Sequence, residues 1–94
     1  MEASMTFKIG DFVDIKCEVQ PGPFSGEHLV TIETINGTIS GFVRESELKQ
    51  EGHGWQVRGK VTRISPDAIE VRILGSFFTT NGIASVQPHL AMIT

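Results

Sequence analysis

Apolar and polar side chains alternate along most of this chain of 94 residues. Between residues 12 and 19, one row of alternate positions is apolar, while the opposite row carries Asp14, Lys16 and Glu18. A period of two is that of a β-strand with one buried and one exposed face. The pattern recurs and predicts an all-β protein. The predicted strands span residues 12–19, 29–35, 38–44, 55–64, 68–74 and 77–86.

Turn-forming residues separate the first three predicted strands. Asn36-Gly37 predicts a two-residue hairpin turn of type I′, since both residue types tolerate a positive φ. The earlier run Pro21–Gly26 interrupts the alternation, because proline cannot donate to a strand ladder and glycine adopts φ values that other residues avoid. The second and third strands are therefore expected to form an antiparallel hairpin that follows a loop.

The middle of the chain contains three irregular segments. Glu45–Leu48 is expected to form one helical turn, and residues 49–54, where Gly52 and Gly54 flank His53, are expected to form a mobile connector. In the fourth strand the apolar row changes phase between Val61 and Ile64. A change of phase within a strand predicts a β-bulge, here near Thr62-Arg63.

Short strands with a turn signal every ~8–12 residues are typical of closed barrels. We therefore expect a single small β-barrel of five or six strands, similar to the OB fold. An SH3-like or Tudor-like barrel is the alternative. A chain of 94 residues is long enough for one domain with a modest hydrophobic core. Residues 1–8 are expected to form a flexible N-terminus.

The charge is unevenly distributed along the chain. The formal net charge is −3, but residues 1–57 carry four Lys and Arg against nine Asp and Glu, whereas residues 58–94 carry four against two. A net negative charge argues against strong nonspecific binding to duplex DNA, where neutralising phosphates dominates the affinity. A local basic face remains compatible with this balance.

The sequence offers little material for catalysis or for a membrane. Cys17 lies on an apolar row, where a thiol is an inert small hydrophobe, and His28, His53 and His89 lack the spacing of metal ligands. We therefore expect no enzyme, no metal and no cofactor. A single cysteine, the absence of a long apolar segment and an N-terminus unlike a secretory signal predict a cytoplasmic protein without a membrane partner.

The run Gly41-Phe-Val-Arg-Glu-Ser-Glu-Leu48 leads from a strand into a Ser-Glu-Leu corner. Together with Gly10-Asp-Phe-Val13 and the strand order up to residue 74, it resembles the S1-type OB-fold domains, a family of RNA-binding small barrels. The resemblance implies binding of single-stranded RNA. Phe42 stands where the family has an aromatic residue, and Arg44 occupies the neighbourhood of a family histidine.

An OB-type nucleic-acid site combines aromatic side chains that stack on bases with cations that follow the phosphates. Phe12 and Phe42 lie on the rows opposite the main aliphatic rows of their strands, as stacking requires. The alternative is that these rings pack in a small second core and that the cations form a solvated face. The candidate residues for RNA are Phe12, Phe42, Arg44, Arg58, Lys60 and Arg72.

The rival hypothesis is a protein-interaction or self-associating module. Adjacent residues on a strand point to opposite sides, so one of Phe77 and Phe78 is expected to leave the core. Phe24 lies in the proline-rich loop, and loops on barrels commonly carry binding. The acidic net charge favours this reading, in which Phe24, Phe77 or Phe78 forms an apolar patch.

Overall fold

The computed structural model describes residues 6–52, 54–73, 76–77 and 82–93. Within them the chain forms nine strands and two short 3-10 turns, without an α-helix, so the predicted all-β class is confirmed. The turns are η1 (Glu45–Glu47) and η2 (Pro88–Leu90). The strands are β1 (Phe12–Pro21), β2 (Glu27–Thr34), β3 (Gly37–Arg44), β4 (Leu48–Glu51), β5 (Gly54–Ile64), β6 (Ile69–Ile73), β7 (Ser76–Phe77), β8 (Ile83–Val86) and β9 (Ala91–Ile93).

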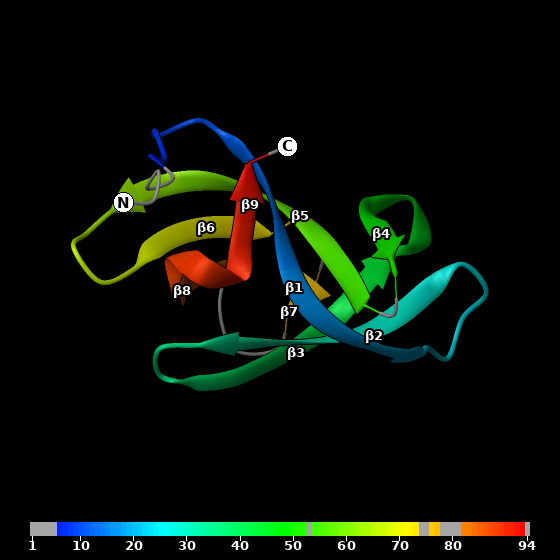
Figure 1. Cartoon of the computed structure of the whole chain (residues 1–94). Helices are drawn as coiled ribbons and strands as arrows, with labels where there is room; N and C mark the ends of the chain where they lie inside the picture. Colours follow the sequence, from blue (N-terminus) through cyan, green and yellow to red (C-terminus); the bar gives the residue numbers. More distant parts are fainter. Residues whose placement is uncertain (1–5, 53, 74–75, 78–81, 94) are drawn as a thin grey trace.

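The strands form one curled antiparallel sheet in the order β7-β3-β2-β1-β5-β6-β8 (Figure 1). After the β1-β2-β3 meander, the chain returns so that β5 pairs with β1 instead of β3. A returning strand of this kind is a Greek-key connection, as in the small OB-like barrel that we predicted. The backbone N–H of Ile35, beyond β2, donates to the carbonyl of Ser85 in β8 at 2.9 Å, which draws the distant parts of the sheet together.

Strand β1 belongs to both layers of the barrel. Its residues 12–17 pair with β5, and residues 13–15 also pair with β9 along the other edge. Further along, residues 18–21 pair with β2. In Figure 1, β1 accordingly runs from the upper layer, formed with β5, β6 and β9, down into the lower layer of β2 and β3.

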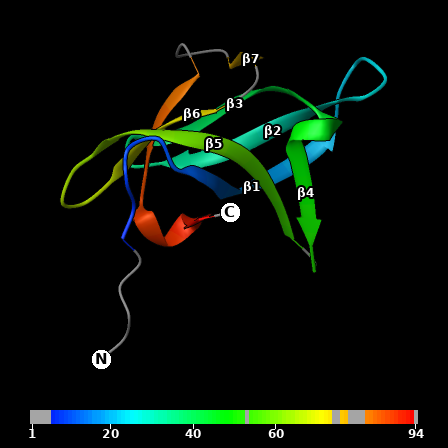
Figure 2. The same cartoon turned by 90° about the horizontal axis from the view of Figure 1, so that it is seen from above.

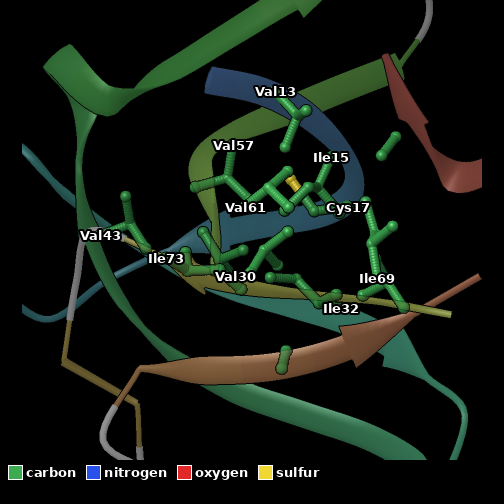
Figure 3. Packing of buried hydrophobic residues seen from close by; sticks show 14 residues of the cluster. Val13, Ile15, Cys17, Val30, Ile32, Val43, Val57, Val61, Ile69 and Ile73 are labelled. Carbon is green, nitrogen blue, oxygen red and sulfur yellow. The ribbon is translucent and has the colours of Figure 1, made fainter. Parts of the chain in front are cut away.

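The core lies between these two layers and is built from the inward rows of the strands (Figure 3). Gly59 of β5 has no room for a side chain, since an added Cβ would lie 3.0 Å from Ile15 Cδ1 and 3.2 Å from the Arg72 carbonyl. Branched aliphatic residues dominate the core, which suits a pleated surface. Its members are Val13, Ile15, Cys17, Val30, Ile32, Val43, Val57, Val61, Ile69, Val71, Ile73, Ala84, Val86 and Ala91.

The predicted β-bulge and helical turn are both confirmed. The β5–β6 register changes between Val61 and Arg63, so that Thr62 has no partner in the register. The Thr62 hydroxyl donates to the Glu70 carbonyl at 3.1 Å across the irregularity. The predicted helical turn is η1, which directly follows β3.

The predicted type I′ turn is wrong. Thr34 pairs with Gly37, so the residues that turn the chain are Ile35 and Asn36. A type I′ turn needs a positive φ at both central residues. In the described chain only glycines have a positive φ; Gly37, at 114°, is one of them and Asn36 is not. Asn36 instead donates its backbone N–H to the Thr34 hydroxyl at 3.1 Å.

The connector predicted over residues 49–54 is also wrong, since residues 49–51 belong to β4, which pairs with β5, and Gly54 begins β5. Leu48 at the start of β4 packs against the core. Strand β9 was not predicted, and the predicted strand 77–86 consists of β7 and β8, whose connecting residues 78–81 lie outside the described part. The predicted end of the fifth strand at residues 74–75 lies outside it as well.

Candidate nucleic-acid interface

The registers of β1, β5 and β6 place three of the predicted site residues in one row. Phe12 is opposite Lys60, and Lys60 is opposite Arg72. Val13, Gly59 and Ile73 form the neighbouring row and are buried. Because successive side chains of a strand point to opposite faces, the row of Phe12 lies on the outside of the barrel.

Phe12 and two cations form the centre of this outer surface. The Phe12 residue is 47% exposed. Arg58 Cζ lies 5.7 Å and Lys60 Nζ 5.8 Å from the centre of its ring, within the range of cation–π contacts. The ring is therefore held among positive charges while half of its surface remains open to solvent.

Further cations continue this surface, which we call the basic face. Lys16 follows Phe12 and Asp14 on the outward row of β1 and lies opposite Gln56. Lys49 of β4 lies opposite Gln56 on the other side of β5. Figure 2, seen from above, shows β1, β5 and β4 side by side. The cations of the basic face are Lys16, Lys49, Arg58, Lys60 and Arg72.

One carboxylate lies within the basic face. Asp14 is opposite Arg58 in the β1–β5 register, and its Oδ2 is 3.7 Å from Lys49 Nζ. The Asp14 side chain is only 11% exposed, whereas that of Lys49 is 58% exposed. Glu51 and Glu70 lie on the same outer rows of β4 and β6, towards the ends of the face. The centre of the face keeps an excess of positive charge.

The structure separates Phe42 and Arg44 from the other four predicted residues. Both lie on β3, where Phe42 is opposite Leu29 and Arg44 is opposite Glu27. Their row faces away from the core on the β2–β3 layer, which is the lower layer in Figure 1. The six residues therefore do not form one continuous groove.

Of the residues of the rival hypothesis, the structure describes Phe24 and the backbone of Phe77. Phe24 is 70% exposed in the loop between β1 and β2. The backbone of Phe77 in β7 pairs with Gly41 of β3. Phe78 lies outside the described residues.

Two residues of the basic face were missed by the sequence reasoning. Lys16 carried a usable signal, since it follows Phe12 by four positions on the same row of one strand. Lys49 carried none, because its segment lacks strand-like alternation and becomes a strand only through pairing with β5. Asp14 was visible as an outward residue, but its burial depends on neighbours from other strands.

The remaining chemistry of the described residues is sparse. Burial raises the pKa of the Cys17 thiol to about 12, so this group stays protonated at neutral pH. Within the described ranges, no three His, Cys, Asp or Glu side chains are grouped so that they could hold a metal ion. The same ranges contain no helix that is both long and apolar enough to cross a bilayer.

No protein-family model matches this chain, and neither does any curated protein or solved structure.

Proposed function

We propose that this protein binds single-stranded RNA through the basic face, with Phe12 as a stacking surface and the surrounding cations as phosphate contacts. The observation that carries the proposal is the clustering of positively charged side chains on one outer surface. Five of the chain's eight Lys and Arg lie on one outer surface, although the net charge of the chain is −3. A local concentration of cations on an acidic protein is the electrostatic footprint of a polyanion site.

The exposed ring favours a single strand over a duplex. Bases of a single strand can stack on an aromatic face, and each stacked base contributes about 1–3 kcal/mol. Bases inside a duplex are already stacked on each other and do not offer their faces. Phe12, 47% exposed between Arg58 and Lys60, combines a stacking surface with nearby charge on one strand pair.

The proposal predicts that the double variant Arg58→Glu and Lys60→Glu loses binding to a 12-nucleotide oligouridylate. Both side chains are exposed, so reversing them replaces two phosphate contacts by repulsion while the core is unchanged. Fluorescence anisotropy at low salt should show an affinity at least about tenfold weaker. Circular dichroism and thermal unfolding of the same sample check that the fold is retained.

Salt dependence provides the second readout of this experiment. For a single strand, the logarithm of the affinity falls with the logarithm of salt concentration by about 0.7 per phosphate contact. The wild-type protein should show a slope of about −2 to −3, as three or four contacts require. The proposed interface would be refuted if the affinity of the wild-type protein did not depend on salt concentration. It would also be refuted if the folded double variant bound the oligouridylate as tightly as the wild type.

A protein-interaction module remains the second candidate, and one observation favours it. Phe24 is 70% exposed on a loop that is closed by backbone hydrogen bonds, from Gly22 to the Glu27 carbonyl at 3.2 Å and from Glu45 to the Gly26 carbonyl at 2.8 Å. A fixed loop that presents an aromatic ring loses little conformational freedom on binding. Phe77 and Phe78 belong to the same hypothesis.

A further inference from the structure

We propose that Asp14 is a positioning residue of the basic face: it holds Lys49 over the face in the unbound protein and gives it up to an RNA phosphate. This inference rests on the proposed function, since it describes how the same face receives its ligand. Asp14, at the centre of the basic face, therefore lowers the affinity of this face for RNA.

The burial of Asp14 is the first observation behind this inference. Among the described residues, Asp14 is the one polar or charged residue in the buried class, at 8% exposed. It nevertheless belongs to the outward row of β1, between Phe12 and Lys16, and not to the core. A carboxylate loses most of its hydration in such a position and needs cations close to it. Arg58 and Lys49 are those neighbours.

The second observation concerns the strand that carries Lys49. Within the described part of the chain, β4 pairs only with β5, and it has four residues. Lys49 reaches from β4 past β5 to Asp14 on β1, and 58% of its side chain is exposed. A long exposed side chain on a short edge strand can change partners readily, because its ammonium group already contacts water and Arg58 remains opposite Asp14 when Lys49 leaves.

The shape of the face places the ion pair in the path of a bound strand. One hollow of about 250 Å³ is lined by Asp14, Lys49, Arg58 and the Ser46–Leu48 corner. A second, of about 240 Å³, is lined by Asp14, Lys16, Glu51 and residues of β5, η2 and β9. Asp14 borders both hollows. A nucleic-acid strand that follows the cations across β1 and β5 therefore passes this carboxylate, which repels its phosphates and competes for Lys49.

The test is the binding of the 12-nucleotide oligouridylate to the Asp14→Asn variant between about 50 and 200 mM salt. Asparagine keeps the shape of the side chain but removes the charge that holds Lys49. We expect roughly threefold to fivefold tighter binding with an unchanged salt slope, because Lys49 contacts a phosphate in both complexes and the variant has no ion pair to break first. Asp67→Asn, in the exposed turn between β5 and β6, removes the same charge away from this ion pair and should change the affinity less than twofold.

A double-mutant cycle separates the effect of the Asp14–Lys49 ion pair on RNA affinity from the effect of the change in net charge. If Asp14 acts mainly through Lys49, the gain from Asp14→Asn becomes much smaller when Lys49 is already glutamine, and only the part due to direct repulsion of phosphates is left. A gain that keeps its full size in the Lys49→Gln background overturns the inference, and so does a folded Asp14→Asn variant that binds no more tightly than the wild type. In either case the wild-type affinity still stands as separate evidence on the proposed function.

One measurement needs no variant. Carbon-detected NMR of the wild-type protein follows the Asp14 carboxyl resonance while the oligouridylate is added. The inference expects this resonance to shift as Lys49 leaves, with the same midpoint as the backbone shifts of Phe12 and Lys60. A resonance that stays in place at saturation overturns the inference while RNA binding stands. A protein that binds no oligonucleotide overturns both.

Discussion

The reactivity of Cys17 is determined by its position on a strand. It lies on the inward row of β1 and is 8% exposed. Burial raises the pKa of its thiol to about 12, because the thiolate would lose its hydration in the core. Since the thiolate is the nucleophilic form, this cysteine is unreactive in the folded protein at neutral pH.

The raised pKa predicts a loss of stability at alkaline pH. In the unfolded chain the thiol ionises near pH 9.0, while in the folded chain it keeps its proton up to about pH 12. Between these values the unfolded state binds fewer protons, so the free energy of unfolding falls as pH rises, by at most about 1.4 kcal/mol per pH unit. Urea unfolding of the wild type and of Cys17→Ala from pH 6 to pH 11 measures this.

The comparison is made between slopes, because Cys17→Ala also removes buried volume and lowers stability at every pH. We expect the wild type to lose stability more steeply than the variant above pH 9, with parallel curves below pH 8. Parallel curves over the whole range would show that the thiol ionises equally well in the folded protein.

For single residues, the sequence was sufficient to predict some members of the candidate site but not how they are grouped. Phe12, Arg58, Lys60 and Arg72 were accessible to prediction because alternation assigns each of them to an outward row. Alternation does not say which outward rows of different strands share a surface. Register and topology decide that, and they place Phe42 on the other layer.

At the scale of elements, alternation predicted the strands that bury one full face. Strands β1, β2, β3, β5 and β6 each have a clear inward row of aliphatic residues. Strands β4 and β9 have four and three residues, too few for a periodic pattern. They are strands because β5 and β1 offer edges for pairing, which is a property of the assembled sheet.

The same contrast predicts a gradient of amide protection. Strand β5 pairs with β1, β4 and β6, and its residues Val57 and Val61 are buried. Strand β4 pairs only with β5 within the described chain. Hydrogen exchange followed by NMR should show β5 amides opening only with global unfolding and β4 amides opening at a much smaller free energy.

Protection of β4 equal to that of β5 would contradict this gradient. It would also weaken the account of Lys49 as a side chain on an easily displaced edge, so the exchange experiment bears on the Asp14 inference independently of any ligand. The amides of β1 residues 13–15, paired on both sides, serve as a second protected reference.

At the scale of the whole molecule, the two layers of the barrel present different outer surfaces. The layer of β1, β5 and β6 carries the basic face, whereas the outer row of β2 and β3 pairs Glu27 with Arg44 and Glu33 with Thr38. The sequence showed only that cations are more frequent after residue 57. It could not show that Lys49, from the acidic part of the chain, joins them.

This separation predicts different effects of two matched variants. Arg72→Glu and Arg44→Glu make the same change at exposed strand positions on opposite layers. If the basic face is the binding surface, Arg72→Glu should weaken oligouridylate binding about threefold to tenfold, through loss of one phosphate contact and added repulsion. Arg44→Glu should leave the affinity nearly unchanged.

The reverse result, with Arg44→Glu weakening binding and Arg72→Glu neutral, would move the interface to the β2–β3 layer, where Phe42 lies. Equal small effects of both variants would point to diffuse attraction by overall charge. Anisotropy at a single low salt concentration is sufficient, provided that both variants show the thermal unfolding transition of the wild type.

The three partners of β1 also determine how the barrel assembles in time. Its pairing with β2 is local, but pairing with β5 and β9 joins Val13 to Gly59 and to Ile93, and each of these closures confines a long segment of flexible chain. Chains rich in such distant pairings fold in milliseconds to seconds, whereas helical bundles fold in microseconds to milliseconds. The β1-β2-β3 meander can form early, but the row of Phe12, Lys60 and Arg72 exists only after the late closures are complete.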